Sequence, residues 1–340
     1  MSTIRLAVVG VGHLGKEHAR IAASIEGASL AAVADVDGAR ARAIAEKHGA
    51  PWFKGHREVL GLVDAAIIAV PTIHHCAVAR EFLSRRIPVL VEKPLAKTIQ
   101  EAEELVALSH ENGTMLAVGH VERFNPAVQA LSGKVGEPRF IECHRLAPFS
   151  FRSTDLDVVM DLMIHDIDII LHFAGSEVAR VDATGVSVLG RGEDIANARI
   201  VFENGCVANV TASRVSDKEM RKIRFFSRDQ YVSLDYQARH AVVYRPGPAL
   251  QGKDPASIAA TPPKTLAERI AFMKSGLLSM EEFKFPADTE PLRLEDESFV
   301  RAVAGGTPPV VSGDHGLRAM RTADLILRAI RESANPSVQG

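Results

Sequence analysis

The sequence predicts an α/β fold in which an N-terminal, doubly wound parallel sheet is followed by an α+β domain with a mainly antiparallel, open sheet. Short apolar runs alternate with amphipathic stretches over the first 120 residues, and longer strands of alternating polarity follow from about residue 121. Asn204-Gly205 lies between two of these later strands and is a strong hairpin signal, because both turn positions need positive φ. The 340 residues leave room for two domains, which we place at residues 1–121 and 122–340.

The strands of the first domain are predicted where short runs are apolar on both faces. Such runs are typical of strands covered by helices on both sides, and strands that alternate with helices form a parallel sheet. The predicted strands are Leu6–Val9, Leu30–Ala34, Ala65–Val70, Val89–Val91 and Met115–Val118.

The second domain is predicted to contain helices, a hairpin and a long irregular segment. We expect a very apolar helix at about residues 155–173, a hairpin of Arg199–Phe202 with Cys206–Thr211, and a closing helix from about Asp314 to Ser333. The packing face of the closing helix is predicted at Leu317, Met320, Leu325 and Ile330. Seven of the 17 prolines lie between Pro246 and Pro291, which indicates a long irregular excursion around a short helix at Thr265–Met273.

Composition excludes several classes of partner. The 40 Lys and Arg residues balance 42 Asp and Glu residues, so there is no general cation excess for nucleic acid or an anionic membrane. The three cysteines are far apart and provide neither a disulfide framework nor a CxxC pair. We find no signal peptide and no apolar run long enough to span a membrane, and therefore expect a cytoplasmic protein.

A dinucleotide site is predicted at Gly10-Val-Gly12-His-Leu-Gly15, which follows the first strand directly and opens an amphipathic helix. The three glycines permit a tight turn, close approach of a pyrophosphate and close helix–strand packing. Asp35 ends the second strand, where a carboxylate accepts from the ribose hydroxyls of NAD and repels the extra phosphate of NADP. NADP stays the less favoured alternative because Arg40 and Arg42 are close in sequence.

Lys93 is predicted to lie at the mouth of the dinucleotide site. Glu92-Lys93-Pro94 follows the fourth predicted strand, at the carboxyl edge of the sheet where doubly wound folds bind their ligands. The proline stops the strand and stiffens the segment that carries Lys93.

The apolar helix carries a narrow polar stripe at Asp157, Asp161, His165, Asp168 and His172, whose spacings of 4, 4, 3 and 4 put them on one face. Buried carboxylates need partners, so the stripe indicates either core hydrogen bonds or an acid/base site in which Asp161 orients His165. A metal site of Asp161, His165 and Asp168 is disfavoured because the chain has no cysteine ligand pair and no H-E-x-x-H motif. We predict no metal.

Together, the glycine turn, Glu92-Lys93-Pro94 and Asp161-Leu-Met-Ile-His165-Asp-Ile-Asp168 resemble the Gfo/Idh/MocA oxidoreductase family. The resemblance implies an N-terminal Rossmann domain, hydride transfer to NAD, and a homodimer or homotetramer formed through the open sheet. It also implies that Lys93 polarises a sugar hydroxyl, that His165 takes the proton and that Asp161 sets the imidazole. The implied cofactor contacts are Gly10, Gly12, His13, Leu14, Gly15, Asp35, Pro71, Thr72, His75, Glu92 and Lys93.

The segment Gly119–Pro126 resembles the branch of the family that oxidises the 3-hydroxyl of UDP-N-acetylglucosamine to the 3-keto sugar. Asn125 and Pro126 also fit a plain helix start. For a nucleoside diphosphate we expect Arg145 or Arg152 at the phosphates and Phe149 or Phe151 at the base. The ordinary alternative is that the arginines are solvated and the phenylalanines fill the core. The predicted substrate contacts are Lys93, Arg123, Asn125, Arg145, Phe149, Arg152, Asp161 and His165.

Two other hypotheses stay open. One is a dehydrogenase of another sugar nucleotide, a free sugar or an inositol, which shares the catalytic residues but needs no phosphate clamp. The other is a non-catalytic, dinucleotide-binding regulator, which would be free to lose the Lys93, Asp161 and His165 that this chain keeps.

Overall fold

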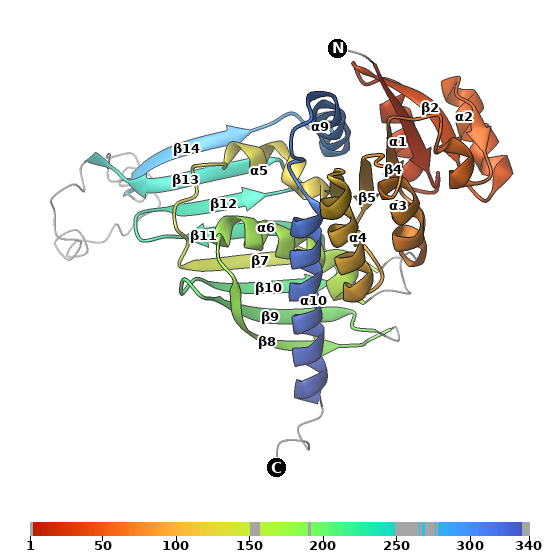
Figure 1. Ribbon diagram of the computed structural model, residues 1–340. Coiled ribbons are helices and arrows are strands. Elements are labelled where there is room, and N and C mark those ends of the chain that lie inside the picture. Colours follow the sequence, from red (N-terminus) through yellow and green to blue (C-terminus); the bar gives the residue numbers. More distant parts are fainter. Residues whose placement is uncertain are drawn as a thin grey trace. The chain divides into compact units, whose positions relative to one another are not determined.

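The computed structural model of the protein describes residues 3–149, 157–189, 192–248, 265, 267–268, 276 and 278–334. Figure 1 shows the elements in chain order. They form two compact units: the first contains Met1–Phe124, Val159–Asp168 and Glu290–Leu327, and the second contains Asn125–Val158, Ile169–Thr289 and Arg328–Gly340. The domain limits at residues 1–121 and 122–340 stay a prediction.

The first unit contains a six-stranded sheet with the strand order β3-β2-β1-β4-β5-β6, in which every pairing is parallel. This confirms the predicted doubly wound sheet. Its strands are β1 (Ile4–Val9), β2 (Ala28–Ala34), β3 (Trp52–Phe53), β4 (Ala65–Ile68), β5 (Val89–Glu92) and β6 (Leu116–Gly119). Its crossover helices are α1 (Gly15–Ala22), α2 (Gly38–His48), α3 (His75–Leu83) and α4 (Ile99–Asn112).

Local sequence sets the ends of these helices. Asp37 caps α2 by accepting from the main-chain N–H of Arg40, and α2 ends at Gly49 in the left-handed conformation. Thr98 and Glu101 form a capping box at the start of α4. These signals fix where α2 and α4 begin and where α2 ends.

Two later segments return to the first unit. Helix α9 (Pro291–Gly305) packs its Phe299 and Val300 into the same core as Ile21 of α1. The main-chain N–H of Val118 in β6 donates to the carbonyl of Val311, just before helix α10 (Gly313–Ala334). The first unit therefore combines its N-terminal sheet with a helix distant in sequence.

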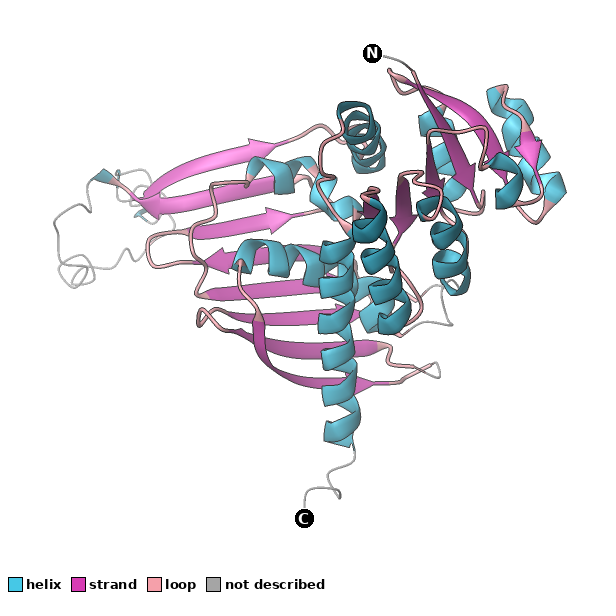
Figure 2. Cartoon of the chain, viewed as in Figure 1, coloured by secondary structure: helices cyan, strands magenta, loops and turns pink. Residues whose placement is uncertain are grey.

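The second unit contains an eight-stranded sheet with the order β14-β13-β12-β11-β7-β10-β9-β8. Among the described pairings, β7 with β10 is parallel and the others are antiparallel, which confirms the predicted mainly antiparallel sheet. Figure 2 shows the strands side by side. They are β7 (Phe140–Leu146), β8 (Val178–Val186), β9 (Ile195–Phe202), β10 (Val207–Ser213), β11 (Met220–Phe226), β12 (Tyr231–Asp235), β13 (His240–Pro246) and β14 (Leu278–Lys284).

The two faces of this sheet differ in burial. One face is buried, and on it Phe173 of helix α6 (Ile164–Ala174) meets Phe225 edge-on at 4.8 Å between ring centroids. The opposite face is half-buried and carries an aromatic ladder across four strands. Successive ring centroids in this ladder lie 5.6, 5.0 and 5.5 Å apart, from Phe140 through Phe226 and Tyr231 to Tyr244.

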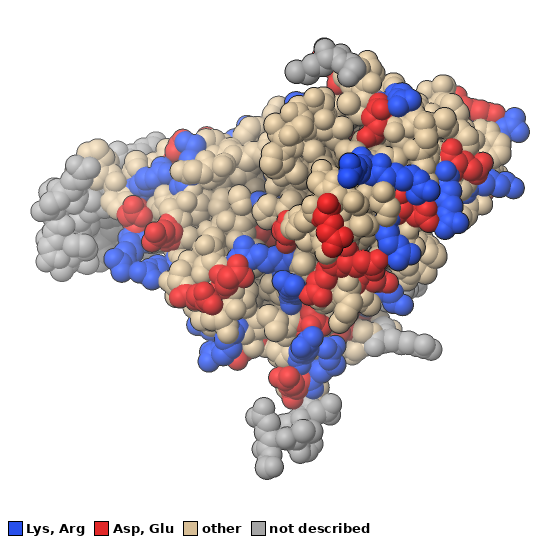
Figure 3. All heavy atoms as spheres, in the orientation of Figure 1, with Lys and Arg blue, Asp and Glu red and all other residues tan. Residues whose placement is uncertain are grey.

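Several local predictions are confirmed. β9 and β10 pair as the expected hairpin, with Gly205 at a φ of +81°. Asn125 caps the short helix α5 (Pro126–Ala130), with Pro126 in its first position. Within the described part of the chain, no helix combines the length and the apolar character that a membrane span requires. Basic and acidic residues are intermixed on the face drawn in Figure 3.

Other local predictions need correction. The apolar helix is α-helical only from Ile164, because Val159–Met163 form a π-helical turn. The sequence analysis missed β3, which has only two residues, and α9, which lies just beyond the proline-rich excursion. Leu325 of α10 is 42% exposed, since Ile326 takes the buried position instead. Most of the expected helix at Thr265–Met273 lies outside the described residues.

Candidate active site

The glycine turn between β1 and α1 has the geometry that its sequence predicts. Gly10 has a φ of +83°, and a β-carbon there would lie 2.7 Å from the main-chain nitrogen of Val70. A β-carbon at Gly15 would lie 1.8 Å from the carbonyl oxygen of Gly10. Gly12 differs, because a β-carbon there would meet no heavy atom within 4 Å. Gly10 and Gly15 are thus required by packing, whereas Gly12 borders open space.

Asp35, at the end of β2, is tied to this turn. Its Oδ2 accepts from the main-chain N–H of Val11 at 2.9 Å, and its Oδ1 accepts from that of Asp37 at 2.9 Å. The guanidinium of Arg40 lies 3.6 Å from Oδ2. An open glycine turn, an anchored carboxylate and the N-terminus of α1 together fit a dinucleotide. His13 and Leu14 lie in the turn with exposed side chains.

The connection after β4 contains Pro71, Thr72 and His75. Pro71 is exposed and Thr72 is half-buried, whereas His75 is buried at the start of α3. Its ring nitrogens lie 2.8 Å from the carbonyl oxygens of Pro94 and Val70. Burial lowers the pKa of His75, so the neutral ring donates to one of these two carbonyls. His75 therefore joins this connection to the segment that carries Lys93.

Glu92, Lys93 and Pro94 lie at the end of β5, as predicted. The Glu92 carboxylate is buried, and its Oε2 accepts from the main-chain N–H of Lys93 at 3.1 Å. Lys93 is joined to Pro94 by a cis peptide bond. The Lys93 side chain is 15% exposed, so its ammonium is close to solvent but does not extend into it.

The Lys93 ammonium meets the π-helical turn. Its Nζ donates to the main-chain carbonyl oxygen of Asp161 at 2.7 Å and lies 3.3 Å from Asp161 Oδ1. Both residues belong to the first unit. π-Helical turns frequently occur at functional sites. The fold thus brings together two of the three predicted catalytic residues, which are 68 residues apart in sequence.

His165 follows Asp161 at the start of α6 and is half-buried. Asp168 is buried and forms an ion pair with Arg123, with 2.6 Å between Arg123 Nε and Asp168 Oδ2. The polar stripe is thus divided: Asp161 pairs with Lys93, and Asp168 pairs with Arg123. Arg123 and Asp168, like Lys93, belong to the first unit.

The remaining predicted substrate residues belong to the second unit or lie outside the described residues. Asn125 Nδ2 donates to the carbonyl of Tyr236 at 3.1 Å. Arg145 is buried in β7, with its guanidinium carbon 5.4 Å from the centre of the Tyr236 ring. Phe149 is 36% exposed. Phe151 and Arg152 lie outside the described residues. Their contacts with a substrate stay predictions.

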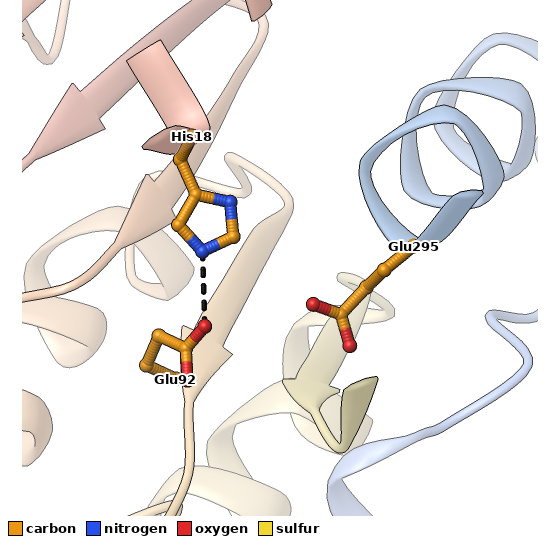
Figure 4. Close-up of side chains that lie close together, drawn as sticks. All are labelled: His18, Glu92 and Glu295. Carbon is orange, nitrogen blue, oxygen red and sulfur yellow. Dashed lines mark hydrogen bonds and ion pairs between the residues drawn. The ribbon is translucent and has the colours of Figure 1, made fainter. Parts of the chain in front are cut away.

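The sequence analysis missed a buried cluster beside Glu92. His18 of α1 lies 2.9 Å from Glu92 Oε1, and its other ring nitrogen lies 2.8 Å from Asp296 of α9. Figure 4 shows His18, Glu92 and Glu295 in this cluster. Among the described residues, these three form the one group of His, Cys, Asp and Glu side chains whose spacing suits a metal ion. The adjacent acids Glu295 and Asp296, near the apolar Phe299 and Val300, were the available signal.

Models of two protein families match the chain. Residues 4–120 match a model described as an oxidoreductase family with an NAD-binding Rossmann fold. Residues 128–230 match a GFO/IDH/MocA C-terminal domain.

The chain is also similar to characterised proteins. It is 36% identical to the UDP-N-acetylglucosamine 3-dehydrogenase of Acidithiobacillus ferrooxidans, over 95% of this chain and 96% of that protein. It is 27% identical to inositol 2-dehydrogenase 2 of Paenarthrobacter aurescens, over 96% of each chain. A solved structure of the Acidithiobacillus ferrooxidans enzyme matches with a TM-score of 0.85 and 35% identity, over 97% of this chain and 98% of that one.

Proposed function

Because the chain belongs to the GFO/IDH/MocA oxidoreductase family, we propose that it oxidises the 3-hydroxyl of UDP-N-acetylglucosamine to the 3-keto sugar with NAD. The observation that carries this proposal is the contact of the Lys93 ammonium with Asp161 at the carboxyl edge of the parallel sheet. Ligands of doubly wound sheets bind at this edge. Similarity to a sugar-nucleotide dehydrogenase over 95% of the chain supports the choice of substrate.

The chain's own residues would divide the chemistry as follows. Lys93 donates a hydrogen bond to the sugar hydroxyl oxygen and polarises the O–H bond, while Asp161 holds the ammonium in place. His165 accepts the hydroxyl proton and is ordered by the same helix. NAD, when bound, accepts the hydride from the carbinol carbon. The proton and the hydride together account for the two electrons and two hydrogens removed from the alcohol.

NAD would be held by the glycine turn and by Asp35. The connection after β4, with Thr72 and His75, and the end of β5, with Glu92, would complete its binding site. Asp35 favours NAD because a carboxylate repels the 2′-phosphate of NADP. Arg40 lies near Asp35, and its own pairing with Asp37 at 3.1 Å leaves it less available to a phosphate.

The diphosphate and the base would be recognised by residues of the second unit. Arg145 and Arg152 supply cations for phosphate oxygens, and Phe149 supplies a flat surface for uracil. Asn125 and Arg123 complete the proposed substrate contacts. The Arg123 guanidinium is paired with Asp168, and this pairing fixes the direction of any N–H that Arg123 donates to the substrate.

A spectrophotometric screen tests the proposal. The purified protein is mixed with NAD or NADP and with UDP-N-acetylglucosamine, UDP-N-acetylgalactosamine, UDP-glucose, glucose, myo-inositol or scyllo-inositol, and reduced nicotinamide is read. A 2-oxo acid recycling system or an aminotransferase is added to draw off the product where equilibrium opposes oxidation. Failure of UDP-N-acetylglucosamine to reduce NAD under both conditions would refute the proposed substrate.

An inositol dehydrogenase is the second candidate function. Its support is the 27% identity to inositol 2-dehydrogenase 2 over 96% of the chain. The same screen separates the candidates, since an inositol dehydrogenase would reduce NAD with an inositol and not with a UDP-sugar. Turnover with any substrate excludes the non-catalytic regulator.

The proposal also includes that the chain forms a homodimer or homotetramer in the cytoplasm. The half-buried face of the eight-stranded sheet, with its aromatic ladder, is the surface that we expect a second copy to cover. Light scattering of the eluting protein measures the assembly, and a monomer at micromolar concentration would contradict it.

A further inference from the structure

A buried histidine supports the main chain that carries Lys93. His18 lies in α1, three residues after the last glycine of the turn, and is 0% exposed. Its neighbours are Glu92 at the end of β5 and Asp296 in α9, which are 7% and 0% exposed. The cluster thus joins three elements of the first unit.

Both ring nitrogens of His18 face carboxylates. Nε2 lies 2.9 Å from Glu92 Oε1, and Nδ1 lies 2.8 and 3.0 Å from the two oxygens of Asp296. A neutral imidazole has one N–H and would point a lone pair at the other carboxylate, whereas the imidazolium donates to both. Burial opposes the charged ring, but Asp296 and Glu92 outweigh it and raise the pKa of His18 well above 6.5.

Glu92 contacts both His18 and the main chain of Lys93. While Oε1 faces His18, Oε2 accepts from the main-chain N–H of Lys93 at 3.1 Å. On the other side of Lys93, a ring nitrogen of His75 lies 2.8 Å from the Pro94 carbonyl oxygen. The bond from Glu92 therefore restrains the main chain at the base of the Lys93 side chain, and Asp161 holds the ammonium at its other end.

The charges around the cluster favour the imidazolium, although burial also raises the pKa of Asp296. Without it, Glu92 and Asp296 would be two buried carboxylates that share no cation, a costly arrangement. The other titratable groups that act on the cluster are Lys93, Glu290, Glu295, His75 and His120. Burial, together with the charges of Glu92 and Asp296, raises the pKa of Glu295 well above its usual range, which favours its neutral form.

We propose that His18 is a positioning residue: as an imidazolium clamped between Glu92 and Asp296, it fixes the Glu92 side chain and thereby the Lys93 main chain. The inference rests on the proposed function in one respect, since it takes Lys93 as the group that contacts substrate. It adds an electrostatic link from the glycine helix to the lysine, anchored by a helix from the far end of the sequence.

The experiment compares His18→Gln, Glu92→Gln and the double variant with the wild type. We expect each single variant to lower kcat by about 10- to 100-fold, to change KM less than about threefold, and to move a limb of the kcat–pH profile. Because the two residues act through one link, the double variant should be no slower than the slower single variant. Additive losses would overturn the proposal.

Ile21→Ala is the matched control. Ile21 lies on the same helix, is 0% exposed and packs in the apolar core, of which Glu92 is not a part. It should lose stability and keep the wild-type kcat and pH profile at temperatures where it is folded. If His18→Gln behaves in the same way as Ile21→Ala, His18 is merely structural and the proposal fails.

A second measurement needs neither turnover nor a folded His18 variant. Nitrogen-15 NMR of the wild-type protein should show both ring nitrogens of His18 protonated at pH 8, and a neutral ring would overturn the proposal. Carbon-13 NMR of dimethylated Lys93, assigned with Lys93→Arg, should shift in Asp296→Asn and Glu92→Gln. If these signals behave as expected while no substrate is oxidised, the proposed function fails and the clamp stands.

Elemental analysis tests a different use of the same side chains. His18, Glu92 and Glu295 are spaced for a divalent cation. A stoichiometric zinc, manganese or magnesium ion that is lost in Glu295→Gln would overturn the clamp and make the cluster a metal site. A metal-free protein with the expected NMR signals supports the clamp.

Discussion

The Lys93 ammonium donates to the main-chain carbonyl oxygen of Asp161 at 2.7 Å, within the π-helical turn that precedes α6. The Asp161 carboxylate lies 3.3 Å from the same ammonium. A lysine held in this way presents its remaining N–H to a ligand in a fixed direction, which is what polarisation of a hydroxyl requires.

Replacing Lys93 by Met should lower kcat by a factor on the order of 10²–10⁴ and weaken NAD binding far less, while the melting temperature changes little. The reason is that the ammonium acts on the reacting oxygen and contributes little to the core. Turnover, NADH fluorescence titration and a thermal melt measure these three quantities. Lys97→Met, at an exposed position four residues later, is the matched control and should behave as the wild type.

His165→Asn should also lower kcat by about 10²–10⁴, and it should abolish the acid limb of the kcat–pH profile if His165 is the base. His172→Asn serves as the control, because His172 is an exposed histidine on the same helix. Retention of the acid limb in His165→Asn would transfer the role of base to Lys93.

Asp35→Asn should shift cofactor preference toward NADP. The amide keeps an acceptor for the N–H of Val11 but removes the charge that repels a 2′-phosphate, so the Kd ratio of NADP to NAD should fall at least about tenfold. Isothermal titration with both cofactors measures the ratio. Asp64→Asn, an exposed partner of Arg5, should leave it unchanged.

Substitutions at Gly10 and Gly12 should have different effects, the first on stability and the second on NAD binding. Gly10→Ala forces a β-carbon to within 2.7 Å of the Val70 nitrogen at positive φ, so we expect a loss of about 1–3 kcal/mol or more in unfolding free energy. Gly12→Ala meets no atom of the chain and should keep its stability while NAD affinity falls at least about tenfold. Denaturation and NAD titration distinguish them. Equal stability losses in both would contradict this account.

Glu295→Gln should change how stability depends on pH. The raised pKa of Glu295 keeps its proton in the folded protein, whereas the unfolded chain loses that proton above about 4.5. The folded state then binds more protons, so wild-type stability falls with rising pH between these two pKa values, by up to about 1.4 kcal/mol per pH unit.

The Gln variant has no such proton. Its unfolding free energy relative to the wild type should therefore rise from pH 5 to pH 8. Urea denaturation at pH 5, 6, 7 and 8 follows the difference, and a pH-independent difference would show that Glu295 is ionised in the folded protein.

Local patterns determined the parallel sheet, the glycine turn, the Asn204-Gly205 hairpin and the position of Lys93 at a strand end. These features depend on neighbours in sequence: positive φ at a turn, apolar runs on both faces of a strand, and a proline that stops it. Periodicity predicted a helix around Asp161, but it assumed a regular α-helix, whereas Asp161 lies in a π-helical turn.

Contacts between distant segments were decided only by the tertiary structure. His18 and Asp296 are 278 residues apart, and Arg123 and Asp168 are 45 apart. No local pattern specifies which buried carboxylate a histidine or an arginine will meet, because the pairing depends on which elements the core brings into contact and on the cost of leaving a buried charge unpaired. The sequence thus predicted candidate groups for the site, and packing determined which partners they meet.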